Sequence, residues 1–309
     1  MATFSPTSAS IEGFRVAMKH PGALVFWGLF YIVAILITIG VVFMAMGPGF
    51  LDALKNASAN ASASADPTAA LKMLGGLFLG FLIAVPVLMV VVTMLNAAVF
   101  RAVLRPEEKG IAYLRLGGDE LRMIAVAFVI GLLFMAVYIV FVLVIGGTIG
   151  VLSAGGGNGR GSAGLIAFPL GLLMFCAFVY VGVKLSLASV MTFAEKRIRI
   201  FESWSLTNGH FWPLLGMYLL VFLIIIGVAI VVGVLSSVFT AMMGAGLYSA
   251  FSGHAPQLTS VAPVAITGLV LYVIVTALHS ALQMALVVAP QASAYRQLTG
   301  DGAKAAEVF

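Results

Sequence analysis

The sequence predicts an all-α fold: a polytopic membrane bundle of six transmembrane helices, with short amphipathic interfacial helices on the cytoplasmic side. Three observations support this prediction. The 309-residue chain is 62% hydrophobic and 9% charged, whereas a typical soluble domain is about 25% charged. Six apolar runs are each long enough to cross about 30 Å of hydrocarbon. Basic residues gather between alternate runs, which indicates how the chain is oriented in a membrane.

The six predicted spans form one integral membrane domain that covers residues 1–309. The second helix is expected to continue beyond its span to Leu104, because Pro106 cannot extend it. Asp119 is a good N-cap for the third span. Pro290 marks the end of the last span or a kink in it. The spans occupy residues 23–46, 71–96, 121–144, 165–190, 211–239 and 261–288, and weakly charged loops are expected at 50–70, 153–164 and 243–260.

Three amphipathic segments are predicted to lie in the membrane interface, each followed by a Gly, Pro or Asn break and an apolar hairpin. The breaks end at Gly22, Gly118 and Gly209, which are 96 and 91 residues apart. This spacing favours three similar hairpins around a pseudo-threefold axis, although turn residues recur easily and a true repeat stays open. The segments are residues 10–20, with Ile11, Phe14 and Met18 on one face, residues 107–116, and residues 195–207.

The positive charges predict the orientation of the chain. Of the 16 Lys and Arg residues, only Lys55, Lys72 and Arg160 fall on the side of the hairpin loops, and 13 fall on the side of the termini. The positive-inside rule therefore places both termini in the cytoplasm. All three tryptophans lie near the same ends of the spans, as expected for an interfacial aromatic belt. We therefore expect a multi-pass membrane protein whose N- and C-termini both lie in the cytoplasm.

The third amphipathic segment and the C-terminal end of the last span carry a family resemblance. The stretches SWSLTNGHFWPLLGMYLL and APQASAYRQL resemble the six-span membrane domain found fused to bacterial glycerophosphodiester phosphodiesterases, and also resemble related uncharacterised inner-membrane families. The similarity covers residues 195–298, and elsewhere it extends only to layout. It implies a membrane-domain fold in the bacterial inner membrane. It does not imply phosphodiesterase activity, because no segment is long enough to hold the hydrolytic domain.

Few residues in the spans suggest chemistry. Asp and Glu are absent from the predicted spans, so carboxylate pairs for proton relays or metal binding are not expected there. The single cysteine, Cys176, lies in an apolar run and is expected to be a small buried apolar residue rather than a reactive thiol. We therefore expect no catalytic residue, no metal site and no cofactor. The basic residues flank apolar runs, which favours anionic lipid headgroups over nucleic acid as partners.

Two groups of residues are candidates for function. A cytoplasm-facing polar pocket is one interpretation of the first group, but isolated polar residues in spans more often make interhelical hydrogen bonds. Basic and tryptophan side chains at the membrane interface make the second group, which is expected to contact lipid headgroups. The candidate pocket consists of Asn96, Lys184, Ser186, His279 and Gln283, and the interface group of Arg101, Arg105, Arg115, Arg122, Lys196, Arg197, Arg199, Trp27, Trp204 and Trp212.

The first functional hypothesis is therefore a non-enzymatic inner-membrane protein that engages lipids or a membrane partner through its basic segments. The alternative is a small-solute or lipid transporter with a cytoplasm-facing polar pocket. An intramembrane enzyme that uses His279 is a distant third. The sequence leaves open whether a protein partner or a homo-oligomer is involved.

Overall fold

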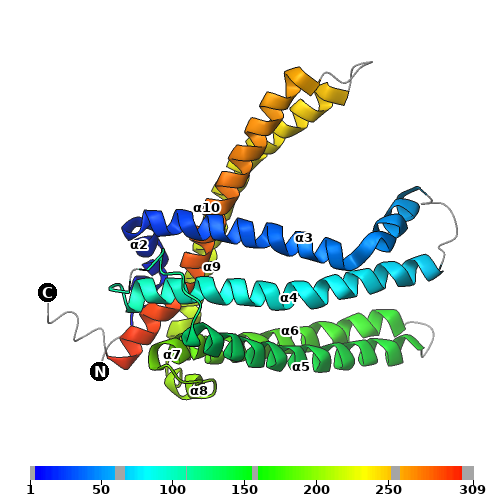
Figure 1. The fold of residues 1–309 in the computed structure, drawn as a ribbon. Helices are drawn as coiled ribbons and strands as arrows, with labels where there is room; N and C mark the ends of the chain where they lie inside the picture. Colours follow the sequence, from blue (N-terminus) through cyan, green and yellow to red (C-terminus); the bar gives the residue numbers. More distant parts are fainter. Residues whose placement is uncertain (1–3, 60–66, 109, 155–158, 252–257, 301–309) are drawn as a thin grey trace.

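The computed structural model describes residues 4–59, 67–108, 110–154, 159–251 and 258–300, which form ten helices and no strand (Figure 1). Six helices are long and apolar enough to cross a membrane, which confirms the all-α class predicted from the sequence. They pair into three antiparallel hairpins. The pairs are α3 (Pro21–Ala59) with α4 (Pro67–Leu104), α5 (Gly118–Ala154) with α6 (Gly159–Leu185), and α9 (Phe211–Phe251) with α10 (Leu258–Thr299).

The four short helices gather where the hairpins converge, a region that we call the base. They are α1 (Pro6–Ser10), α2 (Glu12–Lys19), α7 (Ala188–Glu195) and α8 (Glu202–Leu206). Figure 1 shows that the α3–α4 and α5–α6 hairpins run side by side from the base, whereas α9–α10 diverges from them at a wide angle. The two ends of the described chain meet at the base, where the Ser5 backbone N–H donates to Gln297 Oε1 at 2.9 Å.

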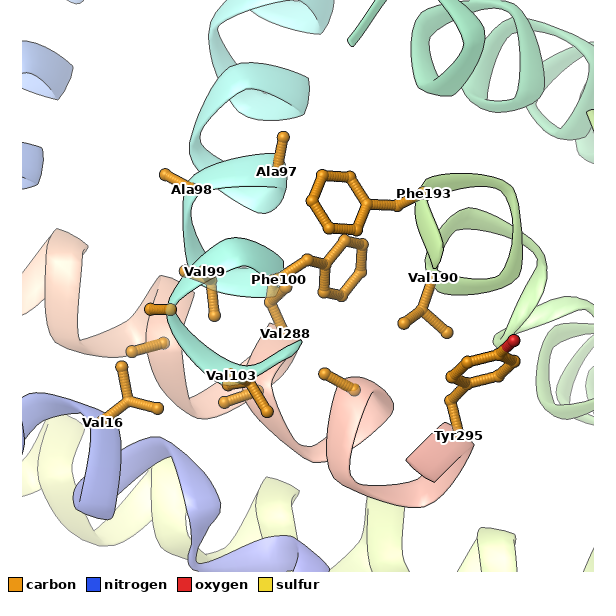
Figure 2. Close-up of a cluster of buried hydrophobic side chains, with 14 of the residues drawn as sticks. Val16, Ala97, Ala98, Val99, Phe100, Val103, Val190, Phe193, Val288 and Tyr295 are labelled. Atoms are coloured by element: carbon orange, nitrogen blue, oxygen red, sulfur yellow. The ribbon is translucent and has the colours of Figure 1, made fainter. Parts of the chain in front are cut away.

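The hydrophobic core lies at the base and not along the hairpins. Figure 2 shows the last turns of α4, the middle of α7 and the last turns of α10 packed together, with Phe100 facing Phe193. The centroids of these two rings are 5.8 Å apart. In contrast, at most 17% of the residues in the most apolar stretch of each span are buried within the chain. The hairpins therefore leave most of their apolar surface to be covered by lipid.

Small residues allow α10 to pack closely on its neighbours. A row of alanines with spacings of three or four residues is buried on this helix, which is the small-residue pattern that lets membrane helices approach. A Cβ on Gly28 of α3 would lie 2.6 Å from the carbonyl oxygen of Ala277, and a Cβ on Gly13 of α2 would lie 2.6 Å from Leu286 Cα. The alanines in the row are Ala277, Ala281, Ala285, Ala289 and Ala292.

The helices extend further than the sequence predicts. Helix α3 kinks at Gly47, which has φ 70° and ψ 171°, but helical structure resumes and reaches Ala59. The predicted loops are correspondingly short, because the helices of each hairpin continue to within a few residues of each other. The end of α3 has the sequence FLDALKNASA, and its alanines have a high helix propensity. Parts of the predicted loops, at residues 60–66, 155–158 and 252–257, lie outside the described residues, as do Lys109 and Lys304.

The end of α10 also corrects a prediction. The helix passes Pro290 and continues to Thr299. Tyr295, which lies beyond the predicted end of the last span at residue 288, is buried, and its hydroxyl donates to Glu195 Oε1 at 3.4 Å. Neighbouring membrane helices often compensate for the hydrogen bond lost at a proline. The predicted fourth span to residue 190 breaks after Leu185, and α7 begins at Ala188.

The predicted helix at residues 107–116 is wrong. Residues 105–108 and 110–117 form a series of turns, which we call the connecting turn, and the chain returns to helix at Gly118. Ala112 and Tyr113 have φ values of 51° and 62°, in the left-handed region that side chains other than glycine seldom adopt. A strained backbone conformation of this kind persists only where contacts with the surrounding structure hold it. The contacts that hold it form the centre of the candidate site.

The first interfacial segment does form a helix, but its buried face differs from the apolar face noted in the sequence. Gly13 and Val16 of α2 face the core, whereas Ile11 and Met18 are exposed. Gly13 is buried because it allows the α10 backbone to come close, and this contact outweighs the burial of larger side chains. The exposed Ile11 and Met18 remain available to the membrane.

Candidate functional site

A buried ion pair lies at the centre of the base. Arg101, near the end of α4, donates through Nη2 to Glu120 in the first turn of α5 and through Nη1 to the Tyr113 carbonyl at 2.9 Å. The second carboxylate oxygen of Glu120 accepts the Gly117 backbone N–H at 2.9 Å, which satisfies a free donor at the start of α5. Arg101 is 3% exposed and Glu120 is fully buried. Each charge therefore depends on the other, because a buried charge without a partner is costly.

Arg105 holds α7, a short helix that precedes the third hairpin, at the centre of the base. Its Nη2 donates to the carbonyls of Phe193 and Ala194 at 3.1 and 3.2 Å, near the end of α7. Its guanidinium also lies 4.8 Å from the Phe193 ring centroid, and its Nη1 is 3.5 Å from Asp119 Oδ2. A cation at the C-terminal end of a helix satisfies carbonyls that have no partner within the helix. Arg105 thus joins α4, α5 and α7.

Trp27 holds the strained part of the connecting turn. Its indole Nε1 donates to the Ala112 carbonyl at 2.7 Å, next to the Tyr113 carbonyl that accepts from Arg101. The His20 ring meets the Tyr113 ring edge-on at 5.5 Å. Trp27 is 1% exposed. Trp27 and Arg101, expected at the lipid interface, are therefore interior residues, because they supply buried donors to two strained carbonyls that need them.

Lys184 is also buried and partnered, at 3% exposure. Its ammonium donates to Asn208 Oδ1 at 2.9 Å and lies 5.8 and 5.9 Å from the ring centroids of Tyr180 and Trp204. The Ser203 hydroxyl donates to the Lys184 carbonyl at 2.8 Å, so both ends of this residue join α6 to α8 and the turn after it. Lys184 is not among the lining residues of the three cavities described below.

The other four candidate pocket residues do not gather around a described cavity either. The Ser186 hydroxyl donates to the Val183 carbonyl at 2.8 Å in its own helix turn, and Gln283 is exposed. Asn96 Oδ1 and His279 Nδ1 are buried, and neither has a hydrogen-bond partner among the described residues. The position of each helix face depends on packing that residue spacing does not specify.

The exposed cations at the base divide into paired and unpaired groups. Among the described residues, Arg122 pairs with Asp119 at 2.8 Å and Arg199 pairs with Glu195 at 2.6 Å. Four exposed cations make no ion pair with any described residue: Lys19, Arg115, Lys196 and Arg197. Large apolar side chains are exposed close to them in the sequence, namely Met18, Ile111, Leu116, Ile198 and Phe201. Alternation of cations with exposed apolar groups is typical of a surface in the headgroup region.

A cavity with charged residues in its lining opens in the connecting turn, with a volume of about 350 Å³. Two further cavities lie in the hairpins and have apolar walls. One of about 240 Å³ lies between α5 and α6, beside Tyr138 and Phe178, and one of about 520 Å³ lies between α3 and α4, beside Thr38 and Met46. The cavity in the connecting turn is lined by Arg101, Glu108, Gly110, Tyr113, Leu114 and Arg115.

Sequence reasoning missed Glu108 and Tyr113 as site residues. The strain that turns Tyr113 inward has no signature in a single sequence, and Glu108 was assigned to a helix start that does not form. The part of the chain that the structure describes also contains no group of three or more His, Cys, Asp or Glu side chains placed to hold a metal ion.

The length and apolar character of six helices, together with exposed apolar flanks, define a multi-pass α-helical membrane protein. Comparison of the chain with protein-family models, with curated proteins and with solved structures finds no match. The resemblance to the membrane domain of the phosphodiesterase fusions therefore stays a prediction from sequence. The function has to be argued from the base itself.

Proposed function

We propose that this protein is a non-enzymatic membrane protein of the bacterial inner membrane that binds phospholipid headgroups through the cationic surface of its base. The observation that carries the proposal is the group of four unpaired cations, Lys19, Arg115, Lys196 and Arg197, set beside exposed apolar side chains. None of the described carboxylates forms an ion pair with these four cations, so no described residue neutralises their charge. Anionic headgroups would supply the missing negative charge.

The orientation is part of the proposal. The base holds most of the positive charge of the chain, and the inner leaflet of a bacterial membrane faces the compartment where the positive-inside rule places such charge. A base on the cytoplasmic side would put Lys196 and Arg197 next to anionic lipids, where each cation near the surface contributes about 1 kcal/mol. Both termini would then be cytoplasmic.

The experiment compares anionic with zwitterionic lipid. Purified protein in detergent is titrated with phosphatidylglycerol or phosphatidylcholine of identical acyl chains, and binding is followed by the shift in thermal unfolding temperature. We expect a larger shift with phosphatidylglycerol, decreasing as salt is raised because exposed charges are screened. The double variant Lys196→Gln and Arg197→Gln should lose part of this difference. Its control, Lys196→Arg with Arg197→Lys, keeps both charges and should retain it. Equal shifts for both lipids would contradict the proposal.

A transporter is the second candidate, favoured by the buried and unpartnered Asn96 Oδ1 and His279 Nδ1. A polar solute passing the spans would need such groups. The variant His279→Ala separates the two proposals. Lipid binding measured as above should be unchanged if the base is the binding surface, whereas a loss of lipid binding in this variant would favour a path through the spans.

A further inference from the structure

The cavity in the connecting turn presents a cation and a carboxylate at separate positions. We propose that it binds the phosphoethanolamine headgroup of a membrane phospholipid, with the phosphate at Arg115 and the ammonium at Glu108. This inference rests on the proposed function, because it assumes that the base meets phospholipid headgroups. It adds a defined site and a selectivity that a diffuse cationic surface does not have.

Arg115 is the cation available to a phosphate. Its Nε lies 3.8 Å from the position that a Cβ on Gly117 would take, and Glu120 Oε2 lies 3.5 Å from the same position. Arg115 therefore lies beside the Arg101–Glu120 pair. Glu120 neutralises Arg101, but Arg115 has no ion pair among the described residues and is exposed. A guanidinium with free N–H groups suits the paired oxygens of a phosphate.

Glu108 is the carboxylate available to an ammonium group. Its only ion pair in the described chain is with Arg105, at 3.9 Å, and its side chain is 40% exposed. Arg105 is engaged more closely by Asp119 and by the carbonyls of Phe193 and Ala194. Among the described residues, the charge of Glu108 is therefore only weakly compensated. A headgroup with negative charge alone would be repelled by this carboxylate, whereas a primary ammonium would donate hydrogen bonds to it.

The size and surroundings of the cavity favour a lipid as the source of the headgroup. Ligand sites usually enclose about 300–1,000 Å³, so about 350 Å³ suits a headgroup and not a whole phospholipid. Ile111 and Leu116 are exposed and flank the lining residues Gly110 and Arg115. These apolar side chains would contact the acyl chains, which a free phosphoethanolamine molecule lacks.

Native mass spectrometry of the delipidated protein tests the proposal. The protein is titrated with phosphatidylethanolamine, phosphatidylglycerol and phosphatidylcholine of matched acyl chains. We expect one tightly bound phosphatidylethanolamine, and weaker binding of phosphatidylcholine, whose quaternary amine has no N–H to donate. Glu108→Gln should weaken phosphatidylethanolamine binding about tenfold, the effect of losing one charge-assisted hydrogen bond, and should leave phosphatidylglycerol binding unchanged or stronger. Arg115→Gln should weaken both.

The control and a competition arm keep the outcomes distinct. The variant Lys196→Gln with Arg197→Gln should lower phosphatidylglycerol binding and leave the bound phosphatidylethanolamine in place. The double variant could leave phosphatidylglycerol binding unchanged while Glu108→Gln still weakens phosphatidylethanolamine binding. That result would contradict the proposed cationic surface and support the headgroup site in the cavity. Unchanged phosphatidylethanolamine binding in Glu108→Gln would overturn the cavity. Displacement of the lipid by an equal concentration of soluble phosphoethanolamine would overturn the lipid source.

Discussion

Arg101 on α4 and Glu120 on α5 form a buried ion pair that closes the connecting turn at both ends. Arg101 also holds the Tyr113 carbonyl inside the turn, and Glu120 also holds the Gly117 N–H at its end. Arg101 is 3% exposed and Glu120 is fully buried. The pair therefore links the first hairpin to the second and holds the connecting turn between them in place.

Removing one member of this pair should be far more costly than removing an exposed pair. Glu120→Ala leaves the Arg101 charge buried without a counter-charge, which is expected to lower the free energy of unfolding by about 3–5 kcal/mol. Unfolding of the purified protein in mixed micelles, followed by circular dichroism as denaturing detergent is added, measures the difference.

Two further variants decide whether the buried charge is the cause. Arg15→Gln removes the exposed pair of Arg15 with Glu12 at 3.1 Å, and we expect a change of about 1 kcal/mol or less. The double variant Arg101→Met with Glu120→Leu removes both charges and should recover much of the lost stability. A single variant Glu120→Ala as stable as Arg15→Gln would contradict the assignment.

Trp27 should control the order of the connecting turn. Trp27→Phe keeps an aromatic ring but removes the N–H that the Ala112 carbonyl accepts, which is expected to cost about 1–3 kcal/mol. Because Ala112 is strained, the turn should open more often, and trypsin should cleave after the exposed Arg115 several times faster. Trp212→Phe is the matched control, since Trp212 is 76% exposed and makes no hydrogen bond among the described residues. Equal cleavage rates for the two variants would rule out this role for Trp27.

The extent to which the fold follows from the sequence depends on the range of the interactions. The spans were predictable because apolar length and composition are local properties. The continuation of α4 to Leu104 was also predictable, because Pro106 ends the helix whatever surrounds it. The connecting turn was not. Glu107, Ile111 and Leu114 have helical spacing, but donors from Trp27 and Arg101 stabilise a strained turn in place of a helix.

The candidate site shows the same division. Composition places cations and tryptophans at the ends of the spans, and Arg115, Lys196, Arg197 and Trp212 are exposed there. Composition does not show which of them turn inward. Arg101, Lys184 and Trp27 are buried because Glu120, Asn208 and the Ala112 carbonyl accept their hydrogen bonds. In the sequence, Glu120 lies 19 residues from Arg101, Asn208 lies 24 residues from Lys184, and Ala112 lies 85 residues from Trp27.

Close packing of α3 on α10 should make Gly28 sensitive to the addition of one methyl group. A Cβ there would lie 2.6 Å from the carbonyl oxygen of Ala277, so one backbone must move. We expect Gly28→Ala to lower the free energy of unfolding by about 1–3 kcal/mol. Gly40→Ala on the same helix has nothing within 4 Å of the added methyl, and it should be neutral or stabilise by about 0.5–1 kcal/mol. Denaturing-detergent titration compares them, and a neutral Gly28→Ala would contradict the contact.

The proposed orientation can be tested by labelling single cysteines in intact cells. Cys176, which is exposed on α6, is first replaced by alanine to remove background reaction. Arg115→Cys then reports on the base, and Gly159→Cys, in the first turn of α6, reports on the opposite end of the same hairpin. A membrane-impermeant maleimide should label Gly159→Cys in intact cells, and Arg115→Cys only after the cytoplasmic membrane is permeabilised. The reverse pattern would place the base outside the cell. The unpaired cations would then face the outer leaflet, and the positive-inside argument for binding anionic lipid at the cytoplasmic face would fail.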